Sequence, residues 1–310
     1  MDLRREIAPA PSLDGELIGI LAGWGRYPVA VAEAIRRRGG RTAILTIRDH
    51  ADEALEPLAD VADVAGEVGV AEIGGAVEFF RRHGVRRATM AGKIHKSKLF
   101  TRHAWLRHLP DWTGINTFWP HIVSRNRDNR DDSLLGAIAL AFDNRGVAIC
   151  PATDFAPELL AEEGLLAGQT LSPRLEADVA FGWRLAKELG RLDIGQTVVV
   201  KNRAPLALEA IEGTDECIRR AGQLCPAGGM TVVKVAKPQQ DLRFDMPTIG
   251  IGTLESLAAA GARVLVIEAG RTILVDRQQL AEFAGRHGIT IASVCDQGGE
   301  AALDSARPAA

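Results

Sequence analysis

The sequence predicts an α/β protein of two domains, the first built on a parallel sheet. Short apolar runs alternate with segments of helical spacing in both halves of the chain, which is typical of sheets covered by helices. A chain of 310 residues is also longer than the about 250 to 300 residues at which single cores stop growing. We place the domain boundary after Cys150, where a predicted strand meets Pro151.

The first domain is expected over residues 17–150, after an extension of residues 1–16 that lacks periodicity. An apolar run, a segment of helical spacing and a second apolar run open this domain, and together they predict a strand, helix, strand unit of a parallel sheet. The predicted strands are 17–22, 41–47, 85–91 and 147–150, and the predicted helices are 29–38, 71–83 and one that begins at Asp131.

The second domain is expected over residues 151–297, before a tail of residues 298–310 rich in Gly and Ala. Its apolar runs again alternate with helical segments, so it is a second α/β domain. The predicted strands are 197–200, 230–235, 264–267, 272–275 and 290–294, and the predicted helices are 157–163, 174–189, 215–221, 254–260 and 276–287.

Composition indicates which kinds of partner to expect and where in the cell the protein is found. A formal net charge of -3 gives no reason to expect nucleic-acid binding. The four cysteines form no Cys-x-x-Cys pair and no signal peptide is visible, so we expect a cytoplasmic protein without structural disulfides. No apolar run approaches the roughly 20 residues that span a bilayer, so any membrane contact would be peripheral.

A glycine-containing turn follows the first predicted strand. Gly23, Trp24, Gly25 and Arg26 lie where the strand passes into a helix, and backbone amides there could hold a nucleotide or phosphate. Pro28 stands where a dinucleotide fingerprint has its third glycine. A tight turn without a ligand explains the same residues, so both interpretations stay open.

Two further polar sites follow predicted elements of the first domain. Lys93 comes after the strand 85–91 and is a candidate anion contact, although a solvated loop lysine is the simpler interpretation. Asp131 and Asp132 suit the positive end of a helix, and they would equally suit Mg²⁺ or a sugar hydroxyl.

The same domain contains three tryptophans spaced seven residues apart, Trp105, Trp112 and Trp119. They favour either a helical cap that packs on the core or an apolar surface for acyl chains.

The densest mixed charge lies in two segments of the second domain, 209–215 and 234–245. In the first, Thr214 is predicted to cap a helix whose first turn carries Asp215. In the second, Asp241 and Asp245 would stand about 13 Å apart on a straight strand, too far to share one ion. A bend, or partnership with Asp215, is therefore required for a metal site. Lys234, Lys237 and Arg243 would neutralise phosphate oxygens.

Taken together, these motifs resemble one known family. They are LAGWGRYP (21–28), AGK (91–93), DDSLL (131–135), EAIEGTD (209–215) and VKVAKPQQDLRFDMPTIG (233–250). In this order and spacing they are similar to the LpxI-type UDP-2,3-diacylglucosamine pyrophosphatases of Gram-negative lipid A synthesis. The resemblance implies a Rossmann-like first domain and a separate α/β second domain. It also implies Mg²⁺-dependent hydrolysis of UDP-2,3-diacylglucosamine to UMP and 2,3-diacylglucosamine 1-phosphate (lipid X).

With this resemblance, we expect the substrate between the domains and assign each residue a role. Asp241 is the first choice for holding Mg²⁺ or orienting the attacking water, with Asp215 and Asp245 as the other metal ligands. Lys234, Lys237 and Arg243 would stabilise charge in the transition state. The expected substrate contacts are Gly23, Trp24, Gly25, Arg26, Lys93, Asp132, Glu212, Gly213, Thr214 and Gln240.

Two other functions fit part of the sequence. An NAD(P)-dependent oxidoreductase would use the glycine turn, with Asp49 at about the right distance for a ribose, but it leaves the two charged segments without a role. A non-catalytic UDP-sugar sensor would bind the nucleotide without releasing UMP. The sequence leaves open whether the protein contacts the inner membrane and whether it forms a homo-oligomer.

Overall fold

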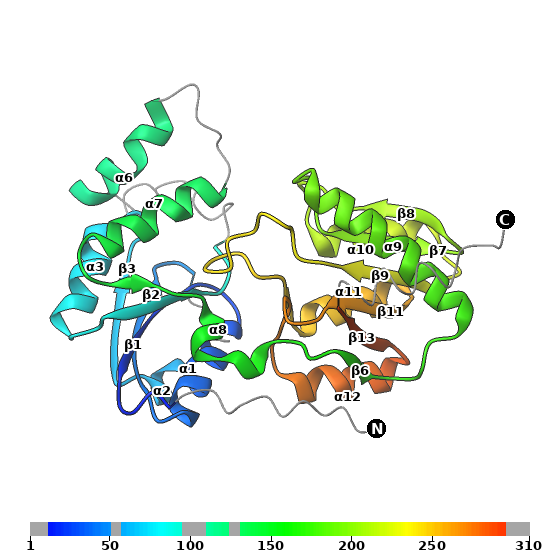
Figure 1. Ribbon diagram of the computed structural model, residues 1–310, viewed down its shortest axis with the longest axis horizontal. Helices are drawn as coiled ribbons and strands as arrows, with labels where there is room; N and C mark the ends of the chain where they lie inside the picture. The colour runs from blue at the N-terminus through cyan, green and yellow to red at the C-terminus, as the bar shows by residue number, and fades with distance from the viewer. Residues whose placement is uncertain (1–11, 51–56, 95–109, 124–130, 296–310) are drawn as a thin grey trace. The chain divides into compact units, whose positions relative to one another are not determined.

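The protein is α/β with two compact units. A computed structural model describes residues 12–50, 57–94, 110–123 and 131–295, and it divides the chain after Glu158 into units 1–158 and 159–310 (Figure 1). Each unit has its own sheet, which confirms the predicted fold class. The division lies beyond Cys150, and the short helix α8 (Ala152–Phe155) packs on α1 of the first unit.

The first unit is built on a five-stranded parallel sheet in the order β3-β2-β1-β4-β5. Its strands are β1 (Leu17–Ala22), β2 (Arg41–Ile47), β3 (Val64–Val68), β4 (Arg87–Ala91) and β5 (Ala148–Ile149). The strand order reverses between β1 and β4, and ligands of open α/β sheets bind beyond the carboxyl ends of strands at such a switch point.

Helices cover both faces of this sheet. They are α1 (Tyr27–Arg37), α2 (Leu58–Val61), α3 (Ile73–Arg82), α6 (Trp112–Val123), α7 (Asp131–Asp143) and α8. In Figure 1, α1, α2 and α8 lie on one side of the sheet and α3, α6 and α7 on the other. Ile20 of β1, Ile35 of α1 and Phe80 of α3 are fully buried, so the core fills both layers between helices and sheet.

The second unit contains a six-stranded mixed sheet in the order β6-β13-β11-β9-β7-β8. Its strands are β6 (Gly164–Ala167), β7 (Thr197–Lys201), β8 (Ala204–Leu208), β9 (Met230–Lys234), β11 (Ala262–Glu268) and β13 (Thr290–Val294). The strands β9, β11 and β13 are parallel, while β6, β7 and β8 run antiparallel to their neighbours. A separate parallel pair joins β10 (Thr248–Ile249) to β12 (Ile273–Leu274).

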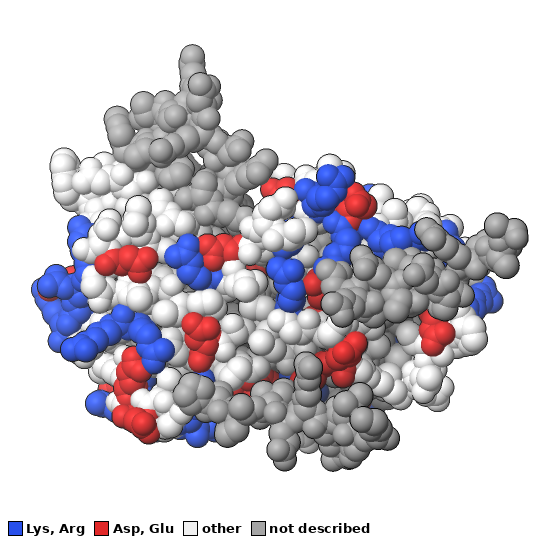
Figure 2. All heavy atoms as spheres, viewed as in Figure 1, with Lys and Arg blue, Asp and Glu red and all other residues white. Residues whose placement is uncertain are grey.

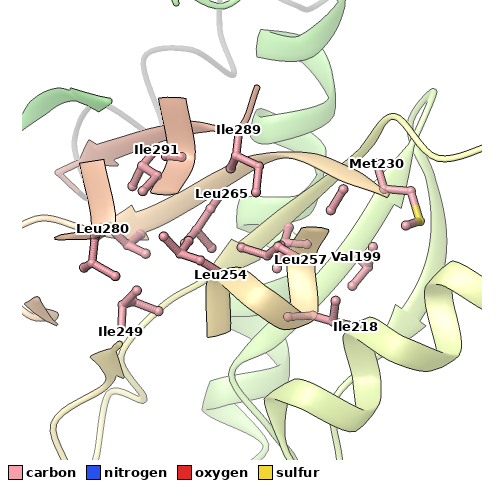
Figure 3. Packing of buried hydrophobic residues seen from close by; sticks show 14 of the residues in the cluster. Val199, Ile218, Met230, Ile249, Leu254, Leu257, Leu265, Leu280, Ile289 and Ile291 are labelled. Atoms are coloured by element: carbon pink, nitrogen blue, oxygen red, sulfur yellow. The ribbon is translucent and has the colours of Figure 1, made fainter. Parts of the chain in front are cut away.

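Alternate residues of the central strands face two different helix layers. The helices are α9 (Pro173–Arg191), α10 (Thr214–Leu224), α11 (Ile251–Ala260) and α12 (Arg277–His287). Val198 and Val233 pack with Trp183 of α9, whereas Val199 packs with Ile218 of α10 on the opposite face (Figure 3). This period of two is what strands buried on both faces require.

The helix predicted over residues 157–163 is wrong. Only one 3₁₀ turn forms, at Pro157–Leu159. Leu160 then makes an isolated β-bridge to Ile273, and the amide of Ala161 donates to the carbonyl of Thr272 at 2.8 Å. These backbone contacts fix the segment beside β12, so it cannot continue as a helix.

Four strands were not predicted, and their sequences explain why. The strand β3 reads VAGEV and β8 reads APLAL, so neither has an uninterrupted run of β-forming residues. Pro205 lies in β8, an edge strand, which is where sheets tolerate proline. The remaining two, β6 and β10, have only four and two residues.

The loops that follow β1 and β4 are joined through their backbones at the switch point. The amide of Gly23 donates to the carbonyl of Ala91 at 2.8 Å, and Trp24 and Lys93 exchange two backbone hydrogen bonds at 2.8 and 3.0 Å. Gly92 has φ +96°, and a Cβ atom there would lie 2.7 Å from the carbonyl carbon of Gly23. Glycine is therefore required at position 92 both for its backbone angle and for the close approach of the two loops.

Replacing Gly92 with Ala should destabilise the first unit. The positive φ and the clash with the backbone of Gly23 together predict a loss of about 2 to 4 kcal/mol in the free energy of unfolding. Urea denaturation followed by circular dichroism measures it. The matched control is Gly136→Ala in α7, where a Cβ meets nothing within 4 Å and about 0.5 to 1 kcal/mol of stabilisation is expected. Equal effects of the two variants would contradict this account of the loop contact.

Candidate functional site

Most of the polar residues singled out in the second unit lie at one edge of its sheet. Register places Thr197, the first residue of β7, opposite Lys234, the last residue of β9. The same register places Ile267 of β11 beside Lys234, and Leu208 of β8 beside Val198. The carboxyl ends of β8, β9 and β11 therefore share this edge with the amino end of β7. Loops at the carboxyl ends of parallel strands are the usual ligand sites of such sheets.

Lys234 is a buried cation at this edge. Its side chain ends β9 and the residue is 6% exposed, and its Nζ donates to the carbonyl oxygen of Thr248 at 3.5 Å. An ammonium group shielded from water interacts more strongly with an approaching anion than a solvated one does. Lys234 is thus placed to stabilise negative charge beyond the end of the strand.

A hydrogen-bonded chain lies beside Lys234. The hydroxyls of Thr197 and Thr214 are 3.2 Å apart, and Thr214 donates to Oε1 of Glu209 at 3.1 Å. The other oxygen of Glu209 accepts the amide of Gln196 at 3.4 Å. These bonds hold the first charged segment against the start of β7.

The prediction that Thr214 caps α10 is wrong. The N-cap is Gly213, with φ +84° and no side-chain cap, and Thr214 is the first helical residue. Its hydroxyl bonds the buried Glu209 instead. Asp215 follows in the first turn of the helix, as expected, together with Glu216.

Glu212 is held by its own loop and by α10. One oxygen of its carboxylate pairs with Arg220 at 2.6 Å, and the other accepts the amide of Ala210 at 3.1 Å. The structure thus gives Glu212 a role in shaping the turn before α10. Its expected contact with substrate stays a prediction.

The second charged segment begins with a compact turn. Lys237 pairs with Asp193 at 3.0 Å, and its amide donates to Oε1 of Gln240 at 3.1 Å. Gln240 is 7% exposed, and its Nε2 is buried without a hydrogen-bond partner in the described structure. A buried amide donor without a partner is costly, and sites that bind a ligand are one place where such groups are retained.

Asp241 and Arg243 form a tight pair within the same loop. Nε and Nη2 of Arg243 donate to the two carboxylate oxygens of Asp241 at 3.0 and 2.7 Å, and the Arg243 amide donates to Oδ1 at 3.0 Å. The side-chain hydrogen bonds from Arg243 lower the pKa of Asp241, against an opposing effect of burial. The guanidinium also lies 4.8 Å from the ring centre of Phe244. Arg243 is therefore held on the loop.

The loop that carries Asp241 and Asp245 is bent. The amides of Phe244 and Asp245 both donate to the carbonyl of Asp241 at 3.1 Å, so the chain turns after this residue. Within the described residues, no group of three His, Cys, Asp or Glu side chains is placed to hold a metal ion. The assignment of Asp215, Asp241 and Asp245 to Mg²⁺ stays a prediction. Mg²⁺ often uses only one or two carboxylates together with substrate phosphates, and these residues allow that arrangement.

In the first unit, the structure brings together the glycine turn and Lys93. Trp24 and Lys93 form an isolated β-bridge immediately beyond β1 and β4. The amides of Gly23 and Trp24 already donate to backbone carbonyls, so they are not available to a phosphate. Gly25, with φ +96° and open space at its Cβ position, and Arg26, the N-cap residue of α1, lie next along the turn.

The remaining calls on the first unit are only partly described. Asp132 lies in the first turn of α7, but its side chain is outside the described residues. Trp105 and the side chain of Trp119 are also outside them, whereas Trp112 is 76% exposed. An acyl-binding role for these tryptophans stays a prediction. Among the described helices, none is long and apolar enough to cross a membrane.

The comparisons with known proteins agree over both units. The LpxI N-terminal domain model matches residues 17–159, and the LpxI C-terminal domain model matches residues 162–292. The chain belongs to the LpxI family. It is 32% identical over 287 residues to the UDP-2,3-diacylglucosamine pyrophosphatase LpxI of Caulobacter vibrioides, an alignment that covers 90% of this chain and 98% of the relative. The two LpxI domain matches meet close to Glu158, where the chain divides into its units.

Sequence reasoning missed two members of this edge. The sequence indicates Thr197 only as the first residue of an apolar run, whereas its hydroxyl lies 3.2 Å from that of Thr214. Glu268 follows the predicted strand 264–267 and has no predicted role, yet it is 2% exposed and its carboxylate binds Nζ of Lys187 and the amide of Ala236. The position of Glu268, a charged residue directly after an apolar strand, was the feature of the sequence that could have identified it as part of this site.

Replacing Arg243 with Ala should raise the pKa of Asp241, because it removes the hydrogen bonds that lower it and leaves burial, which raises it. An NMR titration of the side-chain carboxyl carbons measures this change. Glu216, whose pKa Arg219 lowers, is the control and should not move. An unchanged Asp241 titration would contradict the assignment.

The same titration fixes the sign of a stability effect. A lowered pKa in the folded state means that the pair stabilises the fold above the unfolded pKa, near 3.8, and that this stabilisation is lost as the pH falls through the folded pKa. Both side chains are about one-third exposed, so solvent screening keeps the effect small.

Proposed function

We propose that this protein hydrolyses the diphosphate of UDP-2,3-diacylglucosamine, releasing UMP and 2,3-diacylglucosamine 1-phosphate. The observation that carries the proposal is that LpxI domain models match both units and that a pyrophosphatase of the family aligns with nearly the whole chain. The substrate is then a lipid-linked UDP-sugar, and the reaction belongs to lipid A biosynthesis.

The edge of the second sheet supports this chemistry through its cations. A diphosphate gains negative charge at its leaving oxygen as the bond from phosphorus to the bridging oxygen breaks. Lys234 is held in a buried position, and Lys237 and Arg243 are each fixed by a carboxylate. Cations held in place before the reaction stabilise developing charge without reorganising. Their role is therefore to bind the diphosphate and lower the energy of the transition state.

Gln240 provides a neutral donor at the same loop. Its Oε1 accepts the Lys237 amide, which fixes the orientation of the side-chain amide and directs Nε2 to a buried position without a partner. A phosphate or sugar oxygen would satisfy this donor. The proposal assigns Gln240 to substrate binding on this ground.

Asp241 is proposed to orient the attacking water or to hold Mg²⁺. Its lowered pKa keeps it ionised at neutral pH, which suits an acceptor or a metal ligand. When bound, Mg²⁺ would neutralise phosphate oxygens and favour the hydroxide form of a bound water. Asp215 and Asp245 remain the other proposed ligands. The placement of the substrate against both units stays a prediction, as do contact with the inner membrane and homo-oligomerisation.

Neither alternative function is favoured. A dinucleotide site needs amide donors in the glycine turn, and those of Gly23 and Trp24 are used by the backbone. An NAD(P)-dependent oxidoreductase also gives no role to the charged loop after β9. A non-catalytic UDP-sugar sensor predicts binding without turnover, so a direct assay separates it from the hydrolase.

The decisive experiment is an assay of UMP release. Purified protein and UDP-2,3-diacylglucosamine are incubated with Mg²⁺, and in parallel with excess EDTA, while ³¹P NMR follows the products. We expect UMP and a sugar 1-phosphate with Mg²⁺ and little turnover with EDTA. Binding without turnover under both conditions would refute the hydrolase. Full turnover in EDTA would refute only the role of the metal.

Replacing Lys234 with Met should lower kcat by about 100-fold or more, because a fixed buried cation is lost from the transition state. The matched control is Lys201→Met at the end of β7, whose Nζ donates to the carbonyl of Gly228 at the opposite edge of the sheet. The control should keep kcat close to that of the wild type. Equal activities of the two variants would remove Lys234 from the mechanism.

A further inference from the structure

Glu268 is a buried carboxylate at the same edge of the sheet as Lys234. It is the last residue of β11 and only 2% exposed. An ionised carboxylate in such a place is strongly destabilising unless it is paired and hydrogen-bonded. Its partners therefore show what keeps it there.

The two carboxylate oxygens of Glu268 have different partners: one binds a side chain and the other binds a backbone amide. Oε1 pairs with Nζ of Lys187 at 2.8 Å, and Oε2 accepts the amide of Ala236 at 2.8 Å. Arg271 is a more distant partner at 3.8 Å. Lys187 belongs to α9, and its Nζ lies 5.3 Å from the ring centre of Trp183. The ammonium group therefore contacts both the carboxylate of Glu268 and the ring of Trp183.

The backbone contact is made at the start of the charged loop. Ala236 follows Lys234 by two positions and immediately precedes Lys237. Its amide is fixed by Glu268, and the next amide, that of Lys237, is fixed by the side chain of Gln240. The direction in which the chain leaves β9 is therefore set by two successive side-chain acceptors.

We propose that Glu268, held by Lys187, is a positioning residue for the reaction: it fixes the start of the loop 236–245 so that its cations and Gln240 meet the diphosphate. This inference rests on the proposed function. Glu268 does not touch the substrate. It acts through the amide of Ala236, and its loss would misplace the loop while leaving every cation in the chain.

The same sheet provides a matched control at its opposite edge. Asp178 of α9 is also 2% exposed, and it accepts the amides of Asn202 and Arg203 at 3.0 and 2.6 Å. These two residues form the turn between β7 and β8, with φ of 54° and 58°. Asp178 therefore also uses a buried carboxylate to fix the backbone of a loop, at the edge where β9 begins rather than where it ends.

The test compares Glu268→Gln with Asp178→Asn, each of which turns a buried carboxylate into a neutral amide with one acceptor oxygen. In Glu268→Gln the new NH₂ group must face a donor, either Nζ of Lys187 or the amide of Ala236. Both variants should lower Tm. Glu268→Gln should lower kcat by about tenfold or more with a smaller change in KM, because misplaced cations still attract the substrate but no longer match the transition state. Asp178→Asn should keep the kcat of the wild type. Equal kcat values for the two variants, at matched folded fractions, would overturn the proposal.

A second measurement does not depend on turnover. Amide hydrogen exchange should become faster at Ala236 and Lys237 in Glu268→Gln, and at Asn202 and Arg203 in Asp178→Asn. If the wild type releases no UMP, the proposed function fails, and the exchange data alone decide whether Glu268 fixes the loop. Because the oxygen of Gln can still accept the amide of Ala236, the positioning role is overturned, whatever the activity, if exchange at Ala236 is unchanged in both Glu268→Gln and Glu268→Asp.

Glu268→Asp keeps the experiment decisive if Glu268→Gln does not fold. The shorter side chain keeps the charge opposite Lys187 but cannot also reach the amide of Ala236. Positioning predicts a reduced kcat and faster exchange at Ala236 for this variant too. Wild-type values of both in Glu268→Asp would show that only the buried ion pair matters, and would refute the proposal.

Discussion

The burial of both faces of the second sheet is the constraint on which the site depends. Residues of β7, β9 and β11 alternate between the layer of α9 and the layer of α10 and α11, so no position inside these strands can present a polar group to a ligand without opening the core. Chemistry is therefore restricted to the strand ends. Lys234 and Glu268 are the last residues of the buried strands β9 and β11, and Glu209 is a buried residue that follows the edge strand β8.

The burial of the strands explains why the sequence predicted their positions but not the contacts of the loops that follow them. Apolar runs located β1 and β2 with their observed ends. The chain turns after Asp241, which is one of the two arrangements that the spacing of Asp241 and Asp245 left open for a shared ion. The partners of that bend could not be predicted, because the pairing of Asp241 with Arg243 depends on the backbone of the turn itself. Thr214 shows the same limit, since the acceptor Glu209 is brought to its hydroxyl by the turn before α10 and not by helical periodicity.

Charge is distributed differently at the surface and at the strand ends. On the face drawn in Figure 2, acidic and basic side chains are interspersed. At the carboxyl edge of the second sheet, by contrast, each buried charge has a specific partner and a defined direction. Exposed pairs such as Arg219 with Glu216 contribute little to stability, whereas a buried group such as Glu268 cannot lose its partner without a large penalty.

The backbone contact between Gly23 and Gly92 has a consequence for the thermodynamics of binding. Because Trp24 and Lys93 are tied to each other before any ligand arrives, the backbone around Lys93 has already lost its freedom during folding. A ligand that met Lys93 would have to order only a side chain, whose conformational entropy is worth at most about 2 kcal/mol. The two glycines thus shift the entropic cost of forming this part of the surface from the binding step to the folding of the domain.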